Sequence, residues 1–159
     1  MPMKLSDDGL YFIKTWEAFS GFVYDDFRPK AEWTGRKVTG TLTIGYGHTN
    51  AAADPTRTTL GLRITEPEAA RILRNDLAPA ERAVNDAVTA KLTQHQFDAL
   101  VSFRFNTGRL AGTTLLKRIN AQAFDQVPGE FRKWTKSRGK VLKGLVNRRE
   151  GEIALWNTP

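Results

Sequence analysis

The chain has 159 residues, of which 40% are hydrophobic and 26% charged, and this composition predicts a soluble globular protein able to bury a sizeable core. It contains no cysteine, which excludes a disulfide framework and cysteine-bound metal sites, and leaves only His48 and His95 as imidazole ligands. The formal net charge of +7 favours anionic partners, namely nucleic acid, anionic lipid or an anionic cell-wall polymer. No apolar segment follows a basic start at the N-terminus, so we expect no signal peptide and accumulation in the cytoplasm.

The first predicted element is a helix that begins near residue 6. Ser6 can cap its N-terminus, and two acids follow in the first turn, where the helix dipole favours negative charge. Apolar residues then recur at helical spacing as far as Trp16. Gly21 is expected to end this helix, which places Glu17 in or near its last turn.

Between residues 22 and 46 the pattern changes to strands and turns. Threonine, valine, glycine and aromatic residues dominate, and Leu42, Ile44 and Tyr46 alternate with smaller residues, which predicts a small sheet. Residues 47–63 are rich in Gly, Asn, Asp, Pro and Thr and are expected to form a loop.

Helices are expected in the rest of the chain. Capping boxes that begin at Thr65 and Thr93 each predict a helix start, and Pro79 is expected to break or restart the first of these helices. One helix, a small sheet and then several helices indicate an α+β fold with two lobes. Further helices are expected over residues 115–119, 131–134 and 147–156.

Two acids near the first helix are candidates for catalysis. Glu17 lies between Trp16 and Phe19, and apolar surroundings suit a carboxylic acid to the role of proton donor, whereas Asp26 follows in a more polar stretch. Hydrolysis of a glycosidic bond needs such a pair: one acid protonates the leaving oxygen, and one carboxylate acts on water or on the sugar. The spacing alone is weak evidence, because an exposed helix end and a solvated turn carry the same residues.

Several motifs, in order along almost the whole chain, resemble those of phage-type lysozymes, which are endolysins with muramidase activity. The motifs are WEAF, YDD, TIGYGHT, LTQHQFDALVSFRFNTG, TLLKRIN and GKVLKGLVNRREGEIALW. Several ordered motifs are far more specific than any one of them. The resemblance implies one lysozyme-like catalytic domain over residues 1–159, mainly helical, with a small antiparallel β-sheet lobe and an active-site cleft between two lobes. The implied parts are a β lobe at about 20–63, a helical lobe from 1–19 and 80–159, and a connecting helix at 64–79.

The resemblance also implies an activity, namely hydrolysis of the β-1,4 bond between N-acetylmuramic acid and N-acetylglucosamine in bacterial peptidoglycan. By the same resemblance Glu17 is the general acid, and Asp26 and Thr43 hold the attacking water in an inverting mechanism, which requires a carboxyl separation of roughly 6.5–9.5 Å. By the same resemblance, the enzyme is expected to be a monomer without a metal ion or other cofactor. It is expected to bind glycan strands and no nucleic acid, with transient contact to an anionic wall or membrane surface as a further option. It is expected to reach the periplasm after a holin-type protein permeabilises the membrane during host-cell lysis.

One segment departs from the family pattern. Residues 27–42 separate Asp26 from Thr43, whereas compact members of the family have a much shorter connection, and we expect this segment to form an extended hairpin or loop. Because successive strand residues point to opposite faces, only one of Asp25 and Asp26 can face a cleft. Tyr24, two residues before Asp26, matches the family spacing and favours Asp26.

Other residues receive supporting roles from the resemblance. His48 is expected to pair with Asp76 and so to join the Gly-rich turn to the connecting helix. Phe105 matches a cleft-lining aromatic residue, and a core position is an equal alternative. Arg148 matches an arginine that reaches the catalytic acid and orients it. The alternatives for Arg148 are a solvated helix face, or replacement in this role by Arg149.

Residues 130–149 are strongly basic, with Trp134 among the cations. Nucleic-acid binding, steering onto an anionic wall and insertion of a basic amphipathic helix into a membrane are the functional interpretations, and a solvated surface is the plainer one. Gly139 and Gly144 interrupt the helical period and argue against one long helix. Two alternatives to the hydrolase stay open: a lytic transglycosylase, which needs only one catalytic acid, and a basic antibacterial protein that disrupts membranes.

Overall fold

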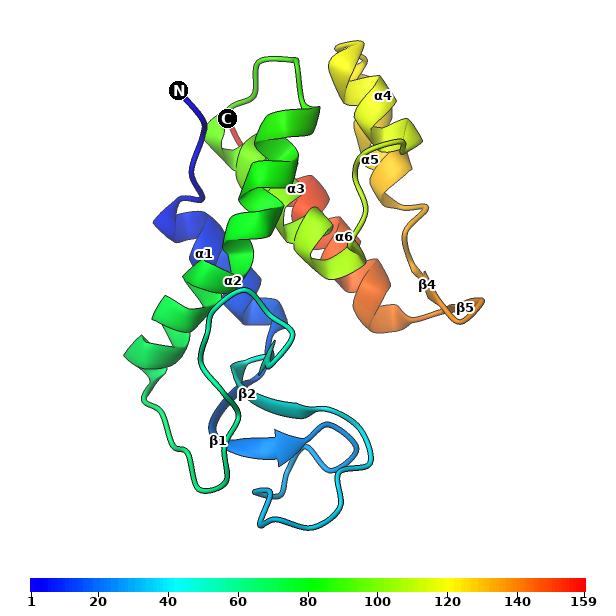
Figure 1. The fold of residues 1–159 in the computed structure, drawn as a ribbon. Coiled ribbons are helices and arrows are strands. Elements are labelled where there is room, and N and C mark those ends of the chain that lie inside the picture. Colours follow the sequence, from blue (N-terminus) through cyan, green and yellow to red (C-terminus); the bar gives the residue numbers. More distant parts are fainter. The chain divides into compact units, whose positions relative to one another are not determined.

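The computed structural model describes residues 1–159 and has a mainly helical α+β architecture with a small antiparallel sheet, the class that the sequence predicts (Figure 1). The helices are α1 (Asp7–Trp16), α2 (Glu66–Ala87), α3 (Gln94–Thr107), α4 (Thr114–Asn120), the short 3-10 helix η1 (Phe124–Gln126), α5 (Val127–Phe131) and α6 (Lys143–Trp156). The strands are β1 (Phe19–Asp25), β2 (Leu42–Tyr46), β3 (His48–Thr49), β4 (Lys136–Ser137) and β5 (Lys140–Val141).

The chain divides into two compact units. The smaller unit consists of residues 12–78, and the larger unit consists of residues 1–11 and 79–159. The division therefore falls inside α1 and inside α2, between Ala78 and Pro79 in the second case. Each unit has its own set of buried apolar residues.

Helix α2 begins at its predicted capping box and does not stop at its proline. The Thr65 backbone N–H donates to Glu68 Oε2 (2.7 Å), and the Glu68 N–H donates to Thr65 Oγ1 (3.3 Å). The expected break at Pro79 is wrong, because the helix continues to its end at residue 87. An internal proline removes one backbone hydrogen bond, and the buried residues Leu77 and Ala80 hold the helix on both sides of it.

The smaller unit is built on a three-stranded antiparallel sheet with the order β1-β2-β3. Tyr24 pairs with Thr43, and Thr43 pairs in turn with Thr49. Gly21 lies inside β1, where its carbonyl oxygen accepts a hydrogen bond from the Ile64 N–H (3.0 Å). The expectation that Gly21 ends the first helix is therefore wrong, because the aromatic and β-branched residues around it pair as a strand.

The core of the larger unit forms around helix α3, which starts at its predicted capping box and ends at Gly108 in the left-handed conformation (φ 70°). Helices α3 and α6 lie side by side (Figure 1). An aromatic cluster extends this core, since the Phe103 ring packs edge to face on Phe131 and on Trp134, with centroids 5.5 and 5.4 Å apart.

The basic segment of residues 130–149 does not form one helix, as its glycines predict. Helix α5 ends at Phe131, so Trp134 lies outside the helix that the sequence predicts for it. A tight turn at Arg138 and Gly139 then joins β4 to β5, and both residues have positive φ (51° and 78°), which matches the twist of a two-stranded hairpin. None of the helices combines the length and the apolar character that a membrane span requires.

Candidate active site

Glu17 is the first residue after helix α1, and it is half-buried. Its backbone N–H donates to the Lys14 carbonyl oxygen (3.2 Å), which closes the last turn of the helix. The Lys14 ammonium lies 2.7 Å from Glu66 Oε1, and the Tyr46 hydroxyl donates to the same oxygen (2.7 Å). These contacts tie the end of α1 to β2 and to the start of α2, so three elements together set the position of Glu17.

The turn after β2 brings backbone against the Glu17 side chain. Gly45 and Gly47 have positive φ (65° and 75°), a conformation that other residues rarely adopt. A Cβ atom at Gly47 would lie 3.4 Å from Glu17 Oε2, and one at Gly45 would lie 3.3 Å from the Ala69 Cβ. Gly47 therefore lies directly beside the Glu17 carboxylate, and Gly45, within β2, lets the strand pack closely on α2.

Asp25 is buried (2% exposed) and closes the inserted loop of residues 27–41. Its Oδ1 accepts hydrogen bonds from the backbone N–H groups of Phe27 and Gly40 (both 3.0 Å), and its Oδ2 accepts one from Thr39 (2.6 Å). These bonds, led by that from Thr39, lower the pKa of Asp25. The segment forms turns and no hairpin, so of the two forms expected from the sequence it is a loop.

Asp26 is exposed, and both Asp26 and Thr43 are hydrogen-bonded to Thr41. The Asp26 N–H donates to the Thr41 carbonyl oxygen (3.1 Å), and the Thr41 N–H donates to Asp26 Oδ1 (2.9 Å). The buried Thr43 hydroxyl donates to the same Thr41 carbonyl oxygen (3.1 Å). The inserted loop therefore returns to the end of β1 and leaves Asp26 and Thr43 close together.

Tyr24 lies near both candidate carboxylates. Burial raises the pKa of its hydroxyl, and the negative charges of Asp26 and Glu17 raise it further. The phenol is therefore protonated at neutral pH and can donate a hydrogen bond. Because Tyr24 also pairs with Thr43 across the sheet, the smaller unit brings four of the residues singled out in the sequence into one neighbourhood.

Sequence reasoning missed Gly40 and Thr41. A Cβ atom at Gly40 would lie 1.8 Å from Asp26 Oδ1 and 2.5 Å from Phe27 Cδ2, so only glycine allows these two side chains to approach the backbone here. The available signal was a glycine placed just before the alternating apolar residues of a strand, which often marks a close approach of another group.

His48 and Asp76, which the resemblance pairs, are in contact and buried. His48 Nδ1 lies 2.7 Å from Asp76 Oδ2, and His48 Nε2 lies 2.7 Å from the Thr56 carbonyl oxygen. The Asp54 N–H donates to Asp76 Oδ1 (2.8 Å). Burial raises the pKa of Asp76, and its hydrogen bonds with Asp54 and His48 oppose this effect. These contacts tie β3 and the loop that follows it to α2. Nowhere in the chain are three or more His, Cys, Asp or Glu side chains placed to hold a metal ion.

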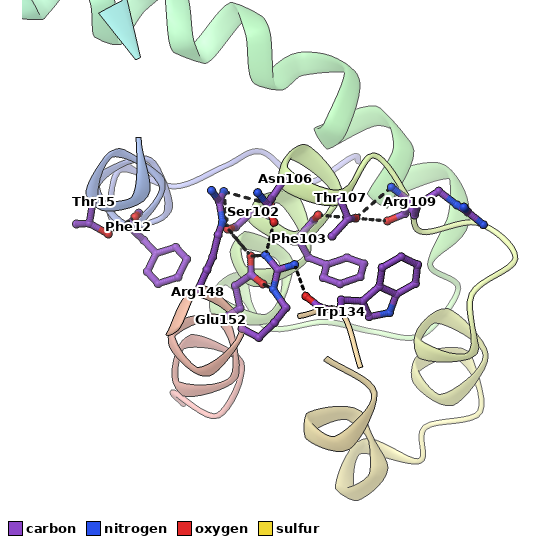
Figure 2. Close-up of polar contacts among 11 residues, drawn as sticks. Phe12, Thr15, Ser102, Phe103, Asn106, Thr107, Arg109, Trp134, Arg148 and Glu152 are labelled. Atoms are coloured by element: carbon purple, nitrogen blue, oxygen red, sulfur yellow. Dashed lines mark hydrogen bonds and ion pairs between the residues drawn. The ribbon is translucent and has the colours of Figure 1, made fainter. Parts of the chain in front are cut away.

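Phe105 and Arg148, the remaining candidates, belong to the larger unit. Phe105 is half-buried. Arg148 is 4% exposed, so the solvated helix face considered for it is wrong. Its Nη2 lies 3.3 Å from Ser102 Oγ and its Nε lies 3.6 Å from Glu152 Oε2 (Figure 2). Its role in orienting Glu17 stays a prediction.

Arg149, the alternative to Arg148, is fully buried and paired within α6. Its Nε lies 2.6 Å from Glu152 Oε1, and its Nη2 donates to Asn106 Oδ1 (2.7 Å). The Ser102 hydroxyl donates to Glu152 Oε2 (2.6 Å), and Figure 2 shows Ser102, Asn106 and Glu152 turned toward one another. This buried network fixes α6 against α3.

Comparison with known proteins identifies the family. The phage lysozyme family matches residues 14–152 of the chain. The chain belongs to the phage lysozyme family. The matched range contains every candidate residue described above, and the family assignment made from the ordered motifs is confirmed.

Curated relatives of this phage lysozyme family member are endolysins. It is 39% identical over 158 residues to the endolysin of Bacillus phage B103, a match that covers 98% of the chain and 55% of the relative. The chain thus spans about half the length of the Bacillus phage endolysins that it matches.

Solved structures share the fold of this phage lysozyme family member. The muramidase domain of SpmX from Asticaccaulis excentricus has a TM-score of 0.79 and 34% identity, with 98% of this chain and 99% of that domain covered. A crystal structure of a P22 lysozyme variant has a TM-score of 0.81 and 29% identity, again with 98% and 99% covered. The lysozyme-like fold that the sequence predicts is confirmed.

Proposed function

We propose that the chain is an endolysin that hydrolyses the β-1,4 bond between N-acetylmuramic acid and N-acetylglucosamine in bacterial peptidoglycan, and so lyses the host cell. One observation carries the proposal: the Asp26 carboxylate and the Thr43 hydroxyl are hydrogen-bonded to the same residue, Thr41. In addition, the negative charges of Asp26 and Glu17 both raise the pKa of the Tyr24 hydroxyl, so Tyr24 lies near both acids. Two carboxylic acids near one another, at the end of a helix and the edge of a sheet, are the groups that glycoside hydrolysis needs.

The proposed proton donor is Glu17. It protonates the oxygen of the leaving sugar as the glycosidic bond breaks, and a general acid of this kind contributes about 10²–10⁴-fold to the rate. Its fixed position supports the role, because the last turn of α1 is held by the Lys14–Glu66 ion pair (2.7 Å) and the Gly47 backbone lies beside its carboxylate. Fixed geometry lowers the entropy lost on reaching the transition state.

The proposed base is Asp26, which accepts a proton from the water that attacks the anomeric carbon. Its Oδ1 is held by the Thr41 N–H (2.9 Å), and its Oδ2 is left to bind that water. The Thr43 hydroxyl donates a hydrogen bond to the Thr41 carbonyl oxygen (3.1 Å), so the hydroxyl oxygen can accept a hydrogen bond from the same water. Attack on the face opposite the leaving group inverts the anomeric centre and needs roughly 6.5–9.5 Å between the carboxyl groups.

The hydrogen bonds of the two neighbouring aspartates support Asp26 in this role rather than Asp25. Three loop N–H groups occupy the buried Asp25 carboxylate, which is therefore engaged in closing the loop. Asp26 is exposed and accepts one backbone hydrogen bond, so it has room to bind water.

Product analysis on purified peptidoglycan tests the proposal. We would compare the wild type with Glu17→Gln and Asp26→Asn, and use Asp125→Asn as a control because Asp125 is an exposed acid in the larger unit. The wild type and the control should release reducing N-acetylmuramic acid ends with inverted anomeric configuration. Both site variants should lose about 10²–10⁴-fold in rate.

Two other outcomes would contradict the proposal in different ways. Anhydro-muramic products, with Asp26→Asn still active, would identify a lytic transglycosylase, which needs only one catalytic acid. No cleavage by the wild type, with bacterial killing retained by Glu17→Gln, would move the function to the basic surface and to membrane disruption.

A further inference from the structure

Phe27 is an exposed aromatic side chain on a fixed backbone. It follows Asp26 directly, and the residue is 70% exposed. Single exposed apolar residues are common and need no explanation. The Phe27 backbone, however, is held at its own N–H, which donates to the buried carboxylate of Asp25 (3.0 Å), and at the next residue, since the Arg28 N–H donates to the Asp25 carbonyl oxygen (2.7 Å). The ring is therefore presented to solvent from a defined position.

The ring also lies beside the proposed base. The position that a Cβ atom would take at Gly40 lies 2.5 Å from Phe27 Cδ2 and 1.8 Å from Asp26 Oδ1. The aromatic ring and the carboxylate thus both pack against Gly40, and there is room for both because Gly40 has no side chain. The Gly40 N–H donates to Asp25 Oδ1 (3.0 Å), which fixes this point in turn.

We propose that the Phe27 ring is a stacking surface for a sugar ring of the glycan strand, next to the bond on which Asp26 acts. The faces of a pyranose ring present C–H groups, and packing them on an aromatic ring buries apolar area while the hydroxyl and acetamido groups at the sugar's edge stay in contact with water or polar groups. The inference rests on the proposed function and adds to it a sugar subsite supplied by the inserted loop of residues 27–41.

Glycan binding measured without turnover is the first test. In the Glu17→Gln background, an oligosaccharide of β-1,4-linked N-acetylglucosamine is titrated by NMR into the protein with and without Phe27→Ala. We expect the substitution to weaken binding about tenfold, as loss of an aromatic contact does, and Phe27→Trp to keep it. Tyr11→Ala is the matched control, because Tyr11 is an aromatic residue of α1 that is 72% exposed, and it should leave binding unchanged.

The second test separates binding from catalysis in the active protein. Phe27→Ala should raise KM about tenfold on peptidoglycan and change kcat little, because the stacking contact is equally strong in the ground state and the transition state. Protection of the Thr39 and Gly40 amide protons from exchange reports whether the loop stays closed on Asp25 in the variant. It should match the wild type.

Three results would overturn the inference. One is an oligosaccharide affinity that Phe27→Ala does not change, or that cannot be detected at all. A second is equal weakening by Tyr11→Ala. A third is an effect confined to substrates that carry stem peptides, which would assign the ring to peptide rather than sugar. Failure of the proposed function has a different signature, namely a wild type that binds the oligosaccharide through Phe27 but releases no reducing ends.

Discussion

Replacing Gly40 with alanine tests how the chain positions Asp26. The added methyl group would lie 1.8 Å from Asp26 Oδ1 and 2.5 Å from Phe27 Cδ2, whereas real Cβ contacts essentially never fall below 3.0 Å. The backbone cannot retreat freely, because the Gly40 N–H donates to the buried Asp25 carboxylate (3.0 Å). The Asp26 carboxylate must therefore move by roughly an ångström or more, and in doing so it leaves the N–H of Thr41.

The expected signature is a large loss of activity with a small loss of stability. Misplacing a catalytic group by about 1 Å costs about 100-fold in rate. Overpacking of a rigid core costs about 1–3 kcal/mol, and the lower end applies here because Asp26 is exposed and its side chain can rotate. For a chain of this size, about 1 kcal/mol lowers the Tm by about 2–4 °C.

Two assays on the same preparation of Gly40→Ala measure the loss of activity and the loss of stability. Release of reducing ends from peptidoglycan gives kcat and KM, and thermal unfolding gives the Tm. Gly144→Ala is the control, since its Cβ atom in the first turn of α6 would meet nothing within 4 Å, and alanine there should preserve both activity and stability. A Gly40→Ala protein with wild-type kcat would refute the claim that Gly40 sets the position of Asp26.

Three further predictions concern stability and titration. Glu152→Gln should lower the free energy of unfolding by about 3–5 kcal/mol in guanidinium melts, because it leaves a buried arginine without its counter-charge. Glu150→Gln is the control, because its pair with Arg132 is exposed and solvent screens it, so its loss should be much smaller; equal losses would contradict this. Loop hydrogen bonds, led by that from Thr39, lower the pKa of Asp25. The contribution of Asp25 to stability is therefore present above the unfolded pKa of about 3.9 and is lost as pH falls through the folded pKa. Asp25→Asn should remove this acid dependence from amide exchange in the loop. Burial and the hydrogen bond to Glu66 raise the pKa of Tyr46 to about 12. The contribution of this hydrogen bond to stability is therefore present below about pH 10 and is lost as pH rises through the folded pKa. Glu66→Gln should lower the midpoint of the ultraviolet titration of Tyr46, and an unchanged midpoint would exclude the Tyr46–Glu66 hydrogen bond.

Local chemistry made several features of this protein predictable from sequence. The helix starts at Thr65 and Thr93 follow from capping boxes, in which both partners lie within three residues of each other. The order of the motifs identified the family, and the helical spacing up to Trp16 placed Glu17 at a helix end. Gly21 shows the limit of such reasoning. Its preference as a helix terminator is local, but its actual place in β1 depends on pairing with residues far along the chain.

Only the tertiary structure shows how differently two neighbouring aspartates are hydrogen-bonded, although the spacing from Tyr24 already favoured Asp26. Asp25 and Asp26 have the same side chain and adjacent positions, so no sequence pattern separates their hydrogen bonds. The separation comes from the point where the inserted loop returns, because Thr39 and Gly40 then meet Asp25 while Thr41 meets Asp26. Loop closure over more than ten residues depends on the whole loop and on the sheet that receives it. The sequence by itself placed Glu17 at a helix end and two neighbouring acids after a run of apolar and aromatic residues, and the closed loop determined that Asp25 is buried and Asp26 exposed.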